Sequence, residues 1–185
     1  MNKTYIKLYA SVFVLFVIGC DSDSVGPESG TTSGRSTLTT ELVNNQGVGF
    51  SFVKGDTVVV STSAIVKPDI FVLIQRNDDG EILGVFLGGR TFLPTFSLKY
   101  ASMNSDSAKM YFQNLKEFSD STYSELAIPA TQNQVWVVKT TDDEYAKILI
   151  ISTSAYDDNS NPSAPTSYGE VTFDWVYQPS GERKF

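Results

Sequence analysis

Histidine is absent from this chain of 185 residues, and cysteine occurs once, at Cys20. Without histidine the protein lacks the usual general base, the Ser-His and Cys-His nucleophile pairs and the commonest ligand of transition metals. A single cysteine excludes an internal disulfide and a redox-active cysteine pair. The common hydrolase and zinc mechanisms are therefore excluded.

Positive charge is also scarce. The 14 Lys and Arg residues stand against 21 Asp and Glu residues, which gives a formal net charge of −7 at pH 7. Removal of residues 1–19 takes away Lys3 and Lys7, so the remainder has 14 − 2 = 12 basic residues and a net charge of 12 − 21 = −9. Such a surface repels nucleic acid and anionic lipid, so we expect no nucleic-acid partner.

An apolar run lies near the amino end, behind the two lysines. Residues 8–18 are apolar apart from Ser11, about 11 residues where a membrane-spanning helix needs roughly 20. This pattern predicts a signal peptide over residues 1–19. Its ending over residues 17–20, Val-Ile-Gly-Cys, resembles the lipobox of bacterial lipoproteins, in which Cys20 is lipidated and becomes the first mature residue. The alternative interpretation is a buried thiol beside an ordinary cleavage site.

Residues 20–41 consist mainly of Ser, Thr, Gly and acidic residues, with Val25 and Leu38 almost the only apolar ones. Because so few apolar side chains do not offset the entropy of ordering a chain, we expect a flexible tether that starts at lipidated Cys20. The remaining residues, 42–185, are the size of one ordinary domain and can bury a full core.

Attachment to the bilayer is expected through acyl chains such as palmitate on Cys20, because multiple chains hold a protein stably without basic residues. The acidic Asp21 and Asp23 follow the cysteine closely. In enterobacteria such an aspartate resembles an inner-membrane retention signal, whereas in Bacteroidetes-type lipoproteins acidic residues there resemble a surface-export signal. We expect a lipid-anchored protein of the cell envelope, in the outer membrane or at the cell surface.

Alternating residues predict a half-buried strand over residues 170–178. Val171, Phe173, Trp175 and Tyr177 share one face of this segment, and polar residues take most of the other.

Two segments that precede it, 134–140 and 145–152, are rich in β-branched residues and flank the short polar stretch 141–144, which is typical of a hairpin. We expect them to pair antiparallel with both faces buried. Further strands are expected at 48–53, 57–61, 69–75, 82–87 and 95–100.

Helical spacing of Ala108, Phe112 and Leu115 predicts one short helix over residues 105–118, capped by Ser105 or Ser107. Residues 157–167 show no periodicity and are expected to form a solvated loop. The predicted fold class is mostly β, a single antiparallel β-rich domain with one short helix.

Catalytic motifs are weak. Ser51-Phe-Val-Lys54, then residues 105–107 and 139–141, occur in the order used by penicillin-binding enzymes, but there the first motif opens a helix. Here the alternation of Phe50 and Phe52 predicts a strand, so we interpret the match as coincidence. A pair of carboxylates of the glycosidase type stays an open alternative, because the fold and not the sequence spacing sets the distance between two carboxylates. We expect no enzyme activity.

Residues 157, 159 and 161 match the opening spacing of a calcium-binding loop, Asp-x-Asn-x-Asn. Pro162 then replaces the required glycine, and Tyr168 occupies the position of the closing glutamate. A polar loop is the better interpretation, and no metal site is predicted.

Aromatic residues and methionines are concentrated in the middle of the chain. One interpretation is core packing, the usual role of both residue types. The other is a pocket or groove for a flat apolar ligand, with a methionine sulfur or tyrosine oxygen available to haem iron. The residues concerned are Phe71, Phe86, Phe92, Phe96, Tyr100, Met103, Met110, Tyr111 and Phe112.

The carboxy-terminal third carries a family resemblance. Residues 135–140 (Val-Trp-Val-Val-Lys-Thr), 145–150 (Tyr-Ala-Lys-Ile-Leu-Ile) and 171–181, with terminal Phe185, resemble the HmuY-like haem-binding lipoproteins of Bacteroidetes and related bacteria. A weaker likeness continues amino-terminally at 50–52, 55–57 and 69–70.

The resemblance implies a mostly antiparallel β fold and haem capture at the cell surface, usually for delivery to an outer-membrane receptor. The best-known member holds iron between two histidines, which this chain lacks. Some relatives are thought to use methionines, so Met103 and Met110 are candidate ligands by residue type, with Tyr100 and Tyr111 as fallback oxygen ligands. The alternative is a surface interaction or structural lipoprotein that keeps the fold without binding haem.

Overall fold

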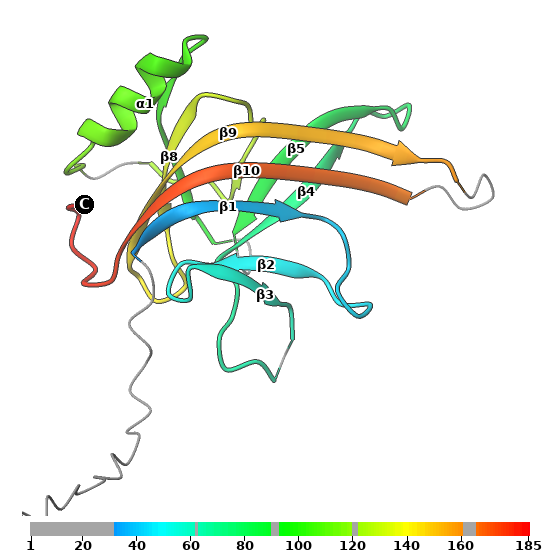
Figure 1. The fold of residues 1–185 in the computed structure, drawn as a ribbon, viewed down its shortest axis with the longest axis horizontal. Helices are drawn as coiled ribbons and strands as arrows, with labels where there is room; N and C mark the ends of the chain where they lie inside the picture. The colour runs from blue at the N-terminus through cyan, green and yellow to red at the C-terminus, as the bar shows by residue number, and fades with distance from the viewer. Residues whose placement is uncertain (1–31, 62, 90–92, 120–121, 161–165) are drawn as a thin grey trace, which may run out of the picture.

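Two antiparallel β-sheets pack face to face around one core (Figure 1). The computed structural model describes residues 32–61, 63–89, 93–119, 122–160 and 166–185. The predicted signal peptide and Cys20 lie outside these residues. The predicted fold class, one mostly β domain with a short helix, is confirmed. The elements are β1 (Ser33–Thr39), β2 (Val48–Ser51), β3 (Asp56–Val59), β4 (Ile70–Arg76), β5 (Ile82–Gly89), β6 (Phe96–Ala101), α1 (Ser105–Asn114), β7 (Leu126–Ala127), β8 (Gln134–Lys139), β9 (Tyr145–Asp158) and β10 (Thr166–Gln178).

The first sheet has the strand order β1-β10-β9-β8-β6, and the second has the order β3-β2-β4-β5-β7. Their facing side chains form an aromatic core. The ring of Phe50, from the second sheet, lies edge-on to Phe173 and Trp175 of the first, at centroid separations of 5.2 and 5.4 Å. Such edge-to-face contacts stabilise a core beyond the area they bury. Within the described residues no helix is long and apolar enough to cross a membrane.

The strongest sequence patterns are confirmed. In β10 the side chains of Val171, Phe173, Trp175 and Tyr177 all point into the core and are at most 6% exposed. Strands β8 and β9 pair antiparallel as predicted. Both faces of this hairpin are buried, because the second sheet covers its inner face and α1 packs on its outer face.

Strand β1 corrects the predicted tether. Residues 33–39 were expected to belong to it, but they pair with β10 along the edge of the first sheet. Leu38 is fully buried in the core, and the Arg35 guanidinium makes a bidentate ion pair with Asp174 (2.6 and 2.9 Å). Backbone hydrogen bonds to β10 order this segment, although its polar composition does not favour folding. The domain therefore begins earlier than residue 42.

The predicted loop over 157–167 is also wrong at both ends. Strand β9 continues to Asp158 and β10 already begins at Thr166, so the two strands form a long arm. Arg76 at the end of β4 explains the extension, because its guanidinium donates to Asp157 (2.5 Å) and to the Ser167 hydroxyl. This contact ties the arm to the second sheet.

Helix α1 is shorter than predicted. It ends at Asn114 and not at residue 118, and its N-cap is Asn104, whose side chain accepts from the amides of Asp106 and Ser107 (both 2.9 Å). The predicted serine caps are therefore wrong. Asn is as good a cap as Ser because its oxygen satisfies the same free N–H groups of the first turn.

The sandwich has two distinct ends (Figure 1). Thr32 lies at one of them, where its carbonyl accepts from Tyr177 (2.7 Å) and where the β8–β9 turn, residues 140–144, also lies. We call this the entry end, because the chain enters the described domain there. The opposite end, the far end, carries the β4–β5 turn and the tip of the β9–β10 arm.

One carboxylate connects the two sheets at the entry end. Asp69, just before β4, is 6% exposed. One of its oxygens accepts from the Phe52 amide (2.9 Å) in the second sheet. The other accepts from the amide (3.0 Å) and hydroxyl (3.1 Å) of Thr141, in the β8–β9 turn of the first sheet. Burial raises the pKa of Asp69 despite these three hydrogen bonds, which lower it.

We predict that Asp69→Asn destabilises the fold by about 1–3 kcal/mol, because an amide nitrogen replaces one acceptor and leaves a buried N–H group unpaired. Urea unfolding at pH 7, followed by tryptophan fluorescence, measures the change. The matched control is Asp79→Asn in the exposed β4–β5 turn, expected to change stability by less than about 0.5 kcal/mol. Equal stability of the two variants would contradict the bridging role of Asp69.

Candidate functional site

The four predicted haem ligands lie around α1 and the end of β6. Tyr100 is on β6, Met103 is in the turn that follows, and Met110 and Tyr111 are on α1. The two tyrosine rings stack on each other with centroids 4.5 Å apart and an interplanar angle of 11°. This separation leaves no space for a flat ligand between them, so the aromatic cluster here serves packing.

Both methionines point to solvent. Met103 is fully exposed and Met110 is 60% exposed, whereas the side of α1 that packs on the sheet carries buried Ala108. Neither methionine lines any of four clefts found among the described residues. Of the four candidates the structure brings Tyr100 and Tyr111 into contact, and this arrangement does not fit a haem held between two side chains of one molecule.

Lys147 of β9 holds α1 in place. Its ammonium group donates to the carbonyls of Phe112 (2.9 Å) and Leu115 (2.7 Å) at the carboxyl end of the helix. A cation there satisfies free carbonyls and interacts favourably with the helix dipole. The residue is 3% exposed, and burial together with the charge of Lys116 lowers the pKa of Lys147 to about 8.

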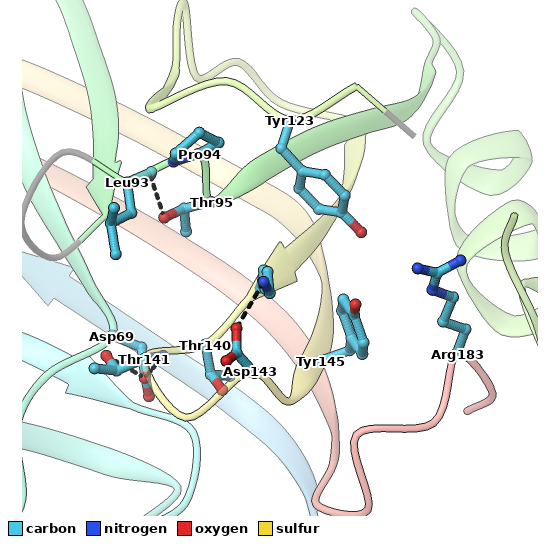
Figure 2. Close-up of a pocket in the computed structure, with 11 residues that line it drawn as sticks. Asp69, Leu93, Pro94, Thr95, Tyr123, Thr140, Thr141, Asp143, Tyr145 and Arg183 are labelled. Carbon is cyan, nitrogen blue, oxygen red and sulfur yellow. Dashed lines mark hydrogen bonds and ion pairs between the residues drawn. The ribbon is translucent and has the colours of Figure 1, made fainter. Parts of the chain in front are cut away.

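A cleft of about 380 Å³ opens at the entry end (Figure 2). It lies where the β8–β9 turn, the segment before β6 and the carboxy-terminal residues meet, and Asp69 contributes from the second sheet. We call it the end cleft. Its lining residues are Asp69, Leu93, Pro94, Thr95, Tyr123, Lys139, Thr140, Thr141, Asp143, Tyr145 and Arg183.

Two cations, two carboxylates and several hydroxyl groups line the end cleft. Figure 2 shows the hydroxyl groups of Tyr123 and Tyr145 and the guanidinium of Arg183 directed toward one region. Lys139 adds a second cation and is paired with Asp143 at 2.6 Å, a hydrogen bond that raises the pKa of Lys139. Such a set of donors binds carboxylate or phosphate groups.

The walls of the end cleft are rigidly supported. The Tyr145 ring is 8% exposed and packs edge-on against Phe118, with centroids 5.1 Å apart. The hydroxyl of Tyr177 donates to the Glu144 carboxylate, which fixes the β8–β9 turn; burial and this bond raise the pKa of Tyr177. A preorganised cleft loses less entropy when it binds a ligand.

The structure also places the other sequence motifs. Ser51 is on strand β2, as the alternation of its neighbours predicted. Asp157 of the calcium-like motif is already held by Arg76 (2.5 Å) and by the Ser167 hydroxyl (2.6 Å). Within the described part of the chain no three His, Cys, Asp or Glu residues are grouped closely enough to hold a metal ion.

We predict that raising the pH from 8 to 10 stabilises the wild type relative to Lys147→Met by roughly 1–2 kcal/mol. Lys147 titrates near 8 when folded and near its ordinary value of 10.5 when unfolded. Between these values the unfolded chain binds more protons, so stability rises with pH. Urea unfolding of both proteins at pH 7–10 measures the difference in stability. The contribution of Tyr177, whose pKa is also shifted, is the same in both proteins and cancels in this difference. Parallel stability curves would refute the lowered pKa.

Comparison with known proteins adds no family assignment. The chain matches no protein-family model, and a search of curated proteins finds no significant match.

Proposed function

We propose that this protein is a lipid-anchored, non-enzymatic binding protein of the cell envelope, and that the end cleft holds a flat, largely apolar ligand with an acidic group. The observation that carries the proposal is the convergence of Tyr123, Tyr145 and Arg183, with Lys139 nearby, in one cleft (Figure 2). Haem, which the family resemblance implies, belongs to this chemical class because it carries two carboxylates on an apolar macrocycle.

The cleft fits haem better than the four sequence candidates do. Arg183 and Lys139 would bind the carboxylates. A tyrosine oxygen, from Tyr123 or Tyr145, is the type of ligand that ferric iron accepts. Leu93 and Pro94 supply apolar lining. Haem would contribute its iron, its carboxylates and its flat apolar surface, and this chain would bind and orient it.

Anchoring at Cys20 supports this arrangement. Between Cys20 and the start of β1 at Ser33 lie 33 − 20 − 1 = 12 residues, which span at most about 43 Å when fully extended. Because β1 starts at the entry end, a lipid-anchored protein would hold the end cleft within this distance of the membrane. Transfer of the ligand to an outer-membrane receptor is the delivery route we propose.

A second candidate function is a surface interaction or structural lipoprotein that keeps the fold without binding haem. The exposure of Met103 and Met110 favours it, as does the absence of histidine from the sequence. In this case the two sheets would serve as a scaffold.

A haemin titration of residues 21–185 tests the proposal. We expect a saturable Soret shift, weakened about tenfold or more in Arg183→Ala, because a hydrogen bond to a charged group contributes about 1.5–3 kcal/mol. Tyr145→Phe keeps the ring and removes the hydroxyl, so an altered ferric spectrum in this variant would identify the iron ligand.

The double variant Met103→Ala, Met110→Ala is the matched control and should bind haemin as the wild type does. Loss of the shift in this control would show that the methionines, and not the end cleft, hold the ligand. The absence of any saturable shift in the wild type would make the interaction lipoprotein the leading function.

A further inference from the structure

A second cleft lies on the other side of the Asp69–Thr141 contact. It has a volume of about 260 Å³, and Asp69 and Thr141 line both it and the end cleft. Ser51 and Asp142 complete its oxygen-bearing side chains, and the rest of its lining is formed by Val53, Ile65, Val66 and Lys67. We call it the acid cleft, because its two carboxylates, Asp69 and Asp142, outnumber its one cation.

Ser51 brings a buried hydroxyl group that none of the described residues satisfies. Its neighbours Phe50 and Phe52 take the core side of β2, so the Ser51 side chain takes the opposite side. The residue is fully buried, yet its hydroxyl has no hydrogen-bond partner among the described residues. Leaving a buried hydroxyl unpaired costs about 1–3 kcal/mol, so such groups normally mark a bound molecule or strain.

Asp69 also has unused capacity. A carboxylate has about four acceptor sites, and Asp69 uses three, for the Phe52 amide and the amide and hydroxyl of Thr141. Neither Asp69 nor Asp142 takes part in any ion pair found among the described residues. Burial and the nearby charge of Asp142 raise the pKa of Asp69.

We propose that the acid cleft binds a small organic ammonium group, which donates hydrogen bonds to the free acceptor site of Asp69, to the Asp142 carboxylate and to the Ser51 hydroxyl. A primary ammonium has three N–H donors, which match these three acceptors. A divalent metal ion fits less well, because calcium takes six to eight oxygen ligands and only two carboxylates line the cleft. This site is independent of the ligand proposed for the end cleft.

Putrescine is the probe that tests the site. In the full-length chain in a neutral detergent, a putrescine titration at constant ionic strength is followed by the amide resonances of Phe52 and Thr141, both of which donate to Asp69. We expect saturable shifts of these two resonances. Roughly tenfold weaker binding is expected in Ser51→Ala, which removes one acceptor of the ammonium group, and in Asp142→Asn, which removes the negative charge of another.

Two controls make the result decisive. Asp142 is exposed, so Asp142→Asn should fold normally, and Arg183→Ala, which alters only the end cleft, should bind putrescine as the wild type does. Unchanged affinity in both Ser51→Ala and Asp142→Asn would overturn the proposal, as would shifts that never saturate. Equal shifts with sodium or calcium chloride would overturn it too, because the cleft would then respond to any cation.

Discussion

The buried carboxylate of Asp69 is the interaction on which the entry end of the sandwich depends. It accepts from Phe52 in one sheet and from Thr141 in the other, so the β8–β9 turn keeps its place relative to β2 only while these bonds exist. A buried carboxylate is costly unless hydrogen bonds or a counter-charge offset its desolvation. Hydrogen bonds offset most of the desolvation cost of Asp69. The raised pKa of this residue shows that the compensation is incomplete. Asp69 also lies between the two clefts and lines both of them. The residue that connects the two sheets is therefore part of the wall of both proposed sites.

Much of the fold could be predicted because its central strands follow local rules. The alternation in β10 and the β-branched hairpin β8–β9 need no knowledge of their partners, since burial on one or both faces dictates their residue types. Strand β1 could not be found this way: only Leu38 is buried, and the rest of the strand is ordered by backbone hydrogen bonds to β10. The extension of the β9–β10 arm depends on Arg76, which is 81 residues from Asp157 in sequence.

The candidate site was less predictable than the fold. Residue type alone selected Tyr100 and Tyr111, but the structure stacks them on each other. The end cleft draws Tyr123, Tyr145 and Arg183 from three separate segments, and no local motif marks their meeting. Ser51 entered the sequence argument only as a member of a doubtful catalytic motif. Its importance comes from being buried without a partner, a property that exists only once loops from both sheets cover β2.

The proposed anchor and the proposed sites share the entry end, because β1 starts there and both clefts contain Asp69 and Thr141. At the far end the exposed acidic residues include Asp78, Asp79 and Glu170, while the guanidinium of Arg76 is engaged by Asp157 and Ser167. An acidic far end is repelled by an anionic bilayer, whereas the entry end has mixed charge, with Lys139 and Arg183 beside Asp142, Asp143 and Glu144. Because β1 starts at the entry end, anchoring at Cys20 would place both clefts on the membrane side of the domain. Ligands would then reach the two clefts through the space between the domain and the bilayer. The 12 residues between Cys20 and β1 would set the height of this space. With such an anchor, the length of the tether would determine access to the sites.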